Sequence, residues 1–254
     1  MFTLKITRAF RLEYSLNALC ALWVLRIRAL TPTTAIPPLV TKGAAEIEEA
    51  LLKHAVIPDV IDKAPKHFLM ASFRESEAKK AKFLMPQLGN ILDPKVMRMY
   101  PYHLNWPCDN ASMYTLIMTD PDYPSKQRPS MREWHHWLVG NIHVVVKEGN
   151  FLPDIFESDM MSRYVPPNPQ NGTGFHRYIF LVYKQPTGRI RFEEKYLPPE
   201  PNDIERGNFS TRRFAEKYNL GDPIAVSFSL CEWVKLQPTT TSEPSELTTF
   251  NLNL

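Results

Sequence analysis

Proline is the residue that most constrains how this chain of 254 residues folds. The sequence has 23 prolines and only 9 glycines, and these residues separate short apolar runs. Because proline lacks the N–H that a central strand donates, it is confined to strand ends, edges and turns. Apolar runs bounded by such residues predict strands at 68–73, 83–89, 95–104, 113–119, 137–146, 178–183 and 224–230. We therefore expect a mainly β fold with a sandwich or barrel-like core.

Helical patterns are confined to two segments. Residues 42–53 combine apolar Ile47 and Leu51 with charged neighbours at amphipathic spacing. Residues 209–218 begin with Ser210, a residue type that caps helices, and continue with apolar side chains on one face. Both segments are expected to pack on the β core.

The ends of the chain differ from the middle. Residues 1–40 are rich in arginine around an apolar stretch that is too short to span a bilayer. This leader suits a secretory signal, a mitochondrial presequence or an uncleaved extension equally well, so the location stays open between secreted, mitochondrial and cytoplasmic. Residues 41–236 form the expected domain, and residues 237–254 form a flexible tail. A charged run at 74–82 predicts a solvated turn.

Charge and cysteine content exclude several functions. The 30 basic and 27 acidic residues nearly cancel, and without a basic block we expect no nucleic acid partner. Cys20, Cys108 and Cys231 lack the spacing of a zinc site or a disulfide framework. We expect neither a metal nor a cofactor.

Polar residues cluster in two places where strands are predicted to end or begin. Residues 119–142 contain two acidic residues and the neighbours His135 and His136, whose side chains point to opposite faces if the segment is extended. Residues 164–183 contain a Pro/Asn/Gly loop that leads into His176, Arg177 and Tyr178. Turns rich in glycine expose backbone N–H groups, which together with imidazole and phenol groups favour a small anion site.

Three motifs in these clusters carry a resemblance to a known family. DPDYPS at 120–125, REWHHWLVGNI at 132–142 and GTGFHRY at 172–178 resemble, in this order, the phosphatidylethanolamine-binding proteins, which include the Raf kinase inhibitor protein. The likeness runs from about Val56 to Trp233. It implies a large central antiparallel sheet with a smaller packed sheet, a few peripheral short helices, and a pocket at one end of the strands.

The resemblance also implies which residues bind a ligand. Phosphate or the phosphoethanolamine head group would contact a set of seven residues: Asp120, Pro124, His136, Asn168, Gly174, His176 and Tyr178. Four more would support the site: Asp122, Arg132, Trp134 and Arg177. For His135 and Trp134, core packing is favoured over ligand contact. A carboxylate beside an imidazole raises the histidine pKa, so we expect a cation to be available for phosphate.

The sequence departs from the family pattern at three positions. Asn168 stands where relatives have a loop glycine, Ser229 stands where they often have a pocket tyrosine, and the closing helix is missing after Trp233. We expect these changes to open the mouth of the pocket and to weaken phosphate binding.

The leading functional hypothesis is a monomeric binding module and not an enzyme. Its ligand would alter docking to a kinase or a protease, with at most peripheral membrane contact. An acid–base hydrolase using Asp120, His136 and His176 is one alternative, although the region lacks a serine or cysteine nucleophile in an activating context. An interaction protein with a degenerate pocket is another. The sequence identifies neither the physiological ligand nor the protein partner.

Overall fold

The computed structural model describes residues 40–75 and 82–235, which belong to one compact unit, Leu39–Leu254. The predictions for the leader, for the tail at 237–254 and for most of the charged turn at 74–82 lie outside the described residues. Within the described ranges, no helix is long and apolar enough to cross a membrane.

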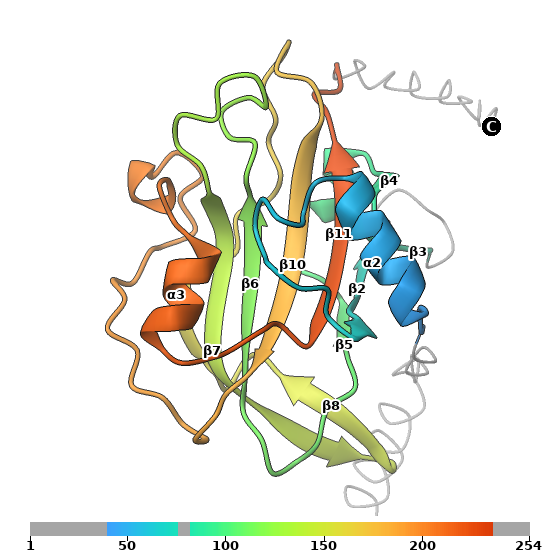
Figure 1. Ribbon diagram of the computed structural model, residues 1–254, viewed down its shortest axis with the longest axis vertical. Helices are drawn as coiled ribbons and strands as arrows, with labels where there is room; N and C mark the ends of the chain where they lie inside the picture. The colour runs from blue at the N-terminus through green and yellow to red at the C-terminus, as the bar shows by residue number, and fades with distance from the viewer. Residues whose placement is uncertain (1–39, 76–81, 236–254) are drawn as a thin grey trace, which may run out of the picture. The chain divides into compact units, whose positions relative to one another are not determined.

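Eight of the described strands form one large sheet (Figure 1). Its main path runs through β1 (His67–Phe68), β11 (Ala225–Cys231), β10 (His176–Lys184), β6 (Tyr114–Asp120), β7 (Trp134–Lys147) and β8 (Asn150–Asp154). β4 (Asn90–Ile91) pairs with β11, and β9 (Asp159–Ser162) pairs with β7. All pairs in this sheet are antiparallel except those that β1 and β4 make with β11.

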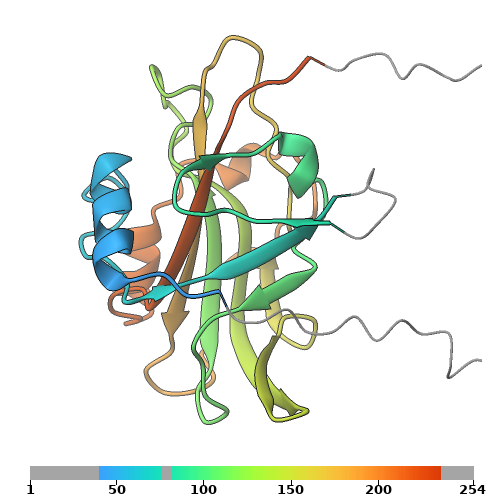
Figure 2. The ribbon, with the colours of Figure 1, turned by 90° about the vertical axis from the view of Figure 1, so that its right-hand side faces the viewer.

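A small sheet and two helices cover opposite faces of the large sheet (Figure 2). The small sheet has the order β3 (Phe83–Leu84), β2 (Met70–Arg74) and β5 (His103–Asn105). The helices are α2 (Ala44–Lys53) and α3 (Thr211–Lys217).

Alternation along the central strands explains these layers. Successive side chains of a strand point to opposite faces, so each strand serves two cores. On β10, Ile179 and Leu181 are buried in the core on the helix side, with Phe214 of α3. Their neighbour Phe180 is buried in the core on the other side, together with Phe73 of β2.

The structure confirms the expected fold class, namely a large, mainly antiparallel sheet with a smaller packed sheet and few short helices. It also confirms both predicted helices, and the Ser210 hydroxyl accepts a hydrogen bond from the backbone N–H of Arg213.

The strand predicted at 95–104 is largely wrong. Residues Pro94–Met97 form the 3₁₀-helix η1, which follows Asp93. The Asp93 carboxylate accepts a hydrogen bond from the backbone N–H of Lys95 at 2.8 Å, and proline is favoured at the first position of a helix. Only His103–Asn105 is extended there. The structure divides the strand predicted at 68–73 between β1 and β2, and it adds strands β4, β8 and β9 and the 3₁₀-helix η2 (Ile204–Arg206), which lay outside the predictions.

A β-bulge lies where β7 begins. Met118 of β6 pairs with Trp137, but Thr119 pairs with His135, so β7 has one residue more than its partner at this point. The extra residue is His136. It faces the small-sheet side together with Trp137, whereas His135 contacts Phe209 on the helix side.

Candidate functional site

Four of the predicted ligand residues meet at one end of the large sheet. Asp120 is the last residue of β6, His176 and Tyr178 lie at the beginning of β10, and His136 lies near the beginning of β7. Because β6 runs antiparallel to both neighbours, its end adjoins their beginnings (Figure 1). The four side chains expose at most 4% of their surface.

A line of hydrogen bonds joins Asp120, His176 and Thr173. The Asp120 Oδ2 lies 2.8 Å from Nδ1 of His176, and Nε2 of the same ring lies 2.9 Å from the Thr173 Oγ1. The second Asp120 oxygen accepts a hydrogen bond from the backbone N–H of Asp122 at 2.8 Å. Burial raises the pKa of the Asp120 carboxyl, and the hydrogen bond with His176 opposes that increase. The carboxylate therefore holds the imidazole in a fixed orientation.

Tyr178 lies between the two histidines. Its ring is stacked on His176 with 6.3 Å between centroids and meets the His136 ring edge-on at 5.1 Å. Burial raises the pKa of the Tyr178 hydroxyl well above its usual value, and the nearby backbone of Asn168 opposes that increase. Tyr178 is therefore a neutral phenol that can donate a hydrogen bond.

His136 has one satisfied and one unsatisfied ring nitrogen. Its Nδ1 lies 2.9 Å from the carbonyl oxygen of Val165, and a carbonyl only accepts, so Nδ1 carries a hydrogen. Its Nε2 is buried and has no hydrogen-bond partner among the described residues. Burial lowers the pKa of His136 to about 3. The ring is neutral, and Nε2 offers a free lone pair.

His136 is therefore neutral and does not provide the cationic imidazole that was expected in the site. The bulge places this ring under the segment 164–169 and away from water, and desolvation disfavours the charged form of histidine. The imidazole that lies beside the Asp120 carboxylate is that of His176.

The neighbours of His136 have packing roles. The His135 ring lies 4.7 Å from the Phe209 ring, and burial lowers its pKa to about 4. Trp134 is stacked on Tyr123 with 4.1 Å between centroids. Both observations agree with the expectation that these two side chains serve the core.

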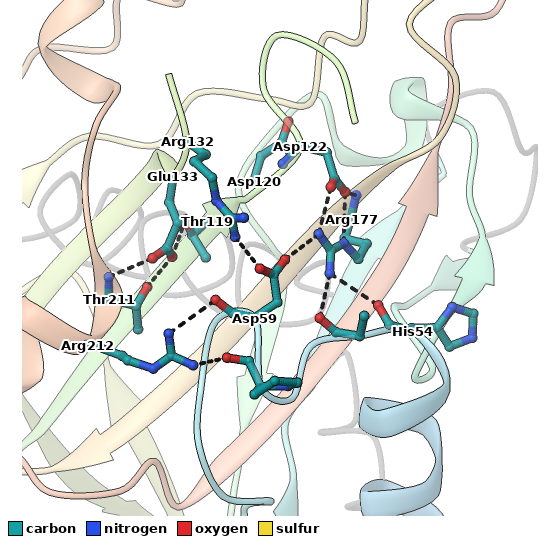
Figure 3. Close-up of polar contacts among 12 residues, drawn as sticks. His54, Asp59, Thr119, Asp120, Asp122, Arg132, Glu133, Arg177, Thr211 and Arg212 are labelled. Carbon is teal, nitrogen blue, oxygen red and sulfur yellow. Dashed lines mark hydrogen bonds and ion pairs between the residues drawn. The ribbon is translucent and has the colours of Figure 1, made fainter. Parts of the chain in front are cut away.

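Three of the expected supporting residues belong to an ion-pair network (Figure 3). The guanidinium of Arg177 donates hydrogen bonds to both oxygens of Asp122, at 2.9 and 2.7 Å, and to Asp59 at 2.8 Å. Arg132 donates to the other Asp59 oxygen at 2.7 Å. Arg177 also donates to the carbonyl oxygen of Ala55 at 2.7 Å. The network ties the segment after α2 to the loop after β6.

The remaining predicted residues lie at the edge of this cluster. Pro124 is half-buried, and Asn168 and Gly174 are exposed. Gly174 has a φ of +77°, a conformation that favours glycine, whereas Asn168 is not among the residues with positive φ. The replacement of a family glycine by Asn168 therefore introduces no backbone strain.

Ser229, which was expected to widen the site, contacts a residue of the 3₁₀-helix η1. Ser229 pairs with Tyr178 across β10 and β11, and its hydroxyl lies 3.9 Å from the sulfur of Met97. The hydroxyl of Tyr164 donates to the Met97 carbonyl at 2.6 Å. Met97 of η1 is thus buried beside Ser229, and the four central side chains are buried as well.

Sequence reasoning missed three residues that shape the site. Thr173 and Val165 provide hydrogen bonds to the two histidines, and Asp59 joins Arg132 to Arg177. Thr173 stands inside the recognised GTG motif, so its position was visible in the sequence. Val165 contacts His136 through its backbone carbonyl, which every residue has, so the residue type could not predict this contact.

Comparisons with known proteins identify the family of this chain. Residues 86–228 match the family model described as phosphatidylethanolamine-binding protein. A putative odorant-binding protein A5 from Drosophila melanogaster is 30% identical over 183 residues, which are 72% of this chain and 79% of that protein.

Two solved structures show a similar fold. A carboxypeptidase Y inhibitor, complexed with its cognate proteinase, matches with a TM-score of 0.59 and 25% identity over 74% of this chain and 96% of the other. A phosphatidylethanolamine-binding protein from Plasmodium vivax matches with a TM-score of 0.53 and 21% identity over 72% of this chain and 96% of the other, a likeness of fold alone. Since the family model spans more than half of the sequence, the chain belongs to the phosphatidylethanolamine-binding protein family.

Proposed function

We propose that this protein is a binding module whose buried cluster of Asp120, His136, His176 and Tyr178 takes a small phosphate ligand of the phosphoethanolamine type. The observation that carries the proposal is the unpartnered Nε2 of His136. A buried polar atom without a hydrogen bond costs on the order of 1–3 kcal/mol, so a ligand that satisfies it gains that amount. The family membership supports the same choice.

The charges around this cluster favour a ligand that carries both a positive and a negative charge. Asp120 is a buried carboxyl group, and the neighbouring Arg177 is engaged by Asp122 and Asp59. A free dianion would therefore meet a carboxylate and a neutral imidazole. The ammonium group of phosphoethanolamine can approach Asp120 or donate to Nε2 of His136, while the phosphate accepts from the Tyr178 hydroxyl and from loop N–H groups.

Contact between a phosphate oxygen and Nε2 requires one proton. An ionised oxygen and a bare lone pair repel each other, so either the ligand keeps a P–O–H group or His136 becomes protonated. Because burial holds the His136 pKa at about 3, contact of a fully ionised phosphate with Nε2 takes up a proton from solvent at neutral pH, whereas donation by the ammonium group takes up none.

Isothermal titration with phosphoethanolamine tests the proposal. His136→Ala should lower the affinity by about tenfold or more, since it removes a charge-assisted hydrogen bond worth on the order of 1.5–3 kcal/mol. His135→Ala is the matched control, because this neighbour is equally buried but faces the helices, and it should keep the affinity. Inorganic phosphate should bind more weakly than phosphoethanolamine. Undetectable binding to the wild type, or equal losses in both variants, would refute the proposal.

Ligand binding at this cluster is proposed to modulate the activity of a protein partner, and a protease is the first choice. The similarity to a carboxypeptidase Y inhibitor supports that choice over a kinase. The direct assay is the activity of carboxypeptidase Y with and without this protein, at several concentrations of phosphoethanolamine. We expect this protein to inhibit the enzyme, and the inhibition to change as the concentration of phosphoethanolamine rises. In His136→Ala, the inhibition should no longer depend on phosphoethanolamine. If carboxypeptidase Y is not inhibited, the proposal of a protease partner is refuted, but the proposal of ligand binding is not affected.

A second candidate function is ester hydrolysis, which one specific observation favours. Asp120, His176 and Thr173 form a line of carboxylate, imidazole and hydroxyl that resembles the relay of a hydrolase. In the resting geometry, however, the Thr173 hydroxyl donates to the carbonyl oxygen of Gln170 at 2.8 Å. Turnover of p-nitrophenyl acetate that survives in Thr173→Ser and disappears in Thr173→Ala would establish this activity. Equal rates in all three proteins would exclude Thr173 as a nucleophile.

A further inference from the structure

A cavity of about 630 Å³ lies on the face of the large sheet that carries the small sheet. Its walls come from three places: the segment from Met99 to Leu104, the β7–β8 hairpin with the turn after it, and the segment from Arg163 to Pro166. Figure 2 shows the β7–β8 hairpin and the chain around β5 on this side of the molecule. The volume lies within the roughly 300–1,000 Å³ that is usual for small-molecule sites. We call this cavity the hairpin groove.

The hairpin groove is lined mostly by apolar and aromatic side chains. Tyr100 and Phe156, from opposite walls, meet edge-on with 5.7 Å between ring centroids. Phe156 exposes 74% of its surface and Met99 exposes 67%. Large apolar side chains that gather at one exposed hollow are typical of a binding site, because water contact with them is unfavourable.

The polar groups of the hairpin groove indicate an anionic ligand. Arg98 and Lys147 line it, and neither makes an ion pair with another described residue. Asp154 is the carboxylate in the lining, and one of its oxygens accepts backbone N–H groups of the following turn. The indole N–H of Trp137, in the wall, is buried without a hydrogen-bond partner among the described residues. The groove thus has spare cations and a spare donor.

We propose that the hairpin groove binds a medium-chain aliphatic carboxylate. The alkyl chain lies against Tyr100, Phe156 and the neighbouring apolar side chains, where it removes their surface from water. The carboxylate lies near Arg98 and Lys147, which attract it and donate to it. A neutral alkane would leave both cations without a counterion. An inorganic anion would leave the aromatic walls in water.

One segment of the chain contributes both to the hairpin groove and to the surroundings of His136. Tyr164 and Pro166 line the groove, whereas the carbonyl of Val165 between them accepts the hydrogen bond from His136. The two sites have different lining residues, so each can be altered alone.

Titration calorimetry with decanoate, below its micelle concentration, tests the hairpin groove on the full chain. Phe156→Ala should weaken binding by about tenfold, the loss typical for truncating a central aromatic contact. The matched control is Ile204→Ala, since Ile204 is 72% exposed but lies outside the groove, and it should bind as the wild type does. Arg98→Gln should weaken decanoate binding but leave the binding of 1-decanol unchanged. Arg213→Gln, an exposed arginine on α3, should change neither.

Several outcomes would overturn the inference. Decanoate that fails to bind, or that binds equally well to Phe156→Ala and to the wild type, contradicts a site in the hairpin groove. Binding of hexanoate as tight as that of decanoate would contradict a role for the alkyl chain. Self-association that Phe156→Ala abolishes would assign the groove to a second copy of the chain. His136→Ala should keep decanoate binding, which separates this test from the one for phosphoethanolamine.

Discussion

The ion pair between Arg177 and Asp122 gives the sharpest prediction on stability. Arg177→Leu leaves the Asp122 carboxylate buried and without its partner. The two side chains are only 6% and 2% exposed, and the guanidinium donates two hydrogen bonds to this carboxylate (Figure 3). Removal of one member of a buried pair costs about 3–5 kcal/mol, because the remaining charge is desolvated and uncompensated. We therefore expect the free energy of unfolding to fall by that amount.

Urea unfolding followed by circular dichroism measures this cost. Arg189→Leu is the control, because its ion pair with Asp159 lies at the surface with 62% of the arginine side chain exposed, and it should cost less than about 1 kcal/mol. Asp122→Asn introduced into the Arg177→Leu background should recover part of the loss, since it removes the orphaned charge. If Arg177→Leu costs no more than Arg189→Leu, the network of Figure 3 does not hold the loop as described.

Two further predictions concern buried groups elsewhere in the same domain. The pKa of His135 is lowered to about 4 and that of His136 to about 3, so the unfolded chain binds more protons below its own histidine pKa of about 6.5. The free energy of unfolding should therefore fall as pH drops from about 6.5 to 4, by up to about 1.4 kcal/mol per pH unit for each histidine. In denaturation experiments, His135→Phe and His136→Phe should each show a weaker dependence of stability on pH. Gly140→Ala should cost about 1–3 kcal/mol, because its Cβ would lie 2.1 Å from the Phe192 ring, whereas Gly43→Ala meets nothing within 4 Å; equal melting temperatures would contradict this.

The strands that form the middle of the sheet could be predicted because their sequences contain continuous apolar runs. Tyr114–Asp120 and His176–Lys184 are buried on both faces or nearly so, and they end at turn residues. The run 95–104 misled because it contains apolar residues at strand-like spacing. Asp93 and Pro94 start a tight helix there, and the backbone hydrogen bond they create outweighs the local β preference. The hairpin strand Asn150–Asp154 is largely exposed, so it lacks the apolar pattern.

The candidate site was predictable in its members but not in its electrostatics. The motifs placed Asp120, His136 and His176 near one another. The bulge at His136 arises from strand register, and its carbonyl partner belongs to Val165, so the sequence gives no sign that this ring is neutral. The sequence also did not show which histidine pairs with Asp120; in the structure, Nδ1 of His176 lies 2.8 Å from Oδ2 of Asp120.

Nitrogen NMR of the histidine rings tests the central claim most directly, because it reports the protonation of each imidazole nitrogen. The free protein should show His136 with a protonated Nδ1 and a bare Nε2 at pH 7. Saturation with phosphoethanolamine should move the Nε2 resonance of His136 to that of a protonated or hydrogen-bonded nitrogen, while His135 stays unchanged. If the Nε2 resonance of His136 stays at the position of a bare nitrogen in the presence of saturating phosphoethanolamine, the ligand does not bind at this ring.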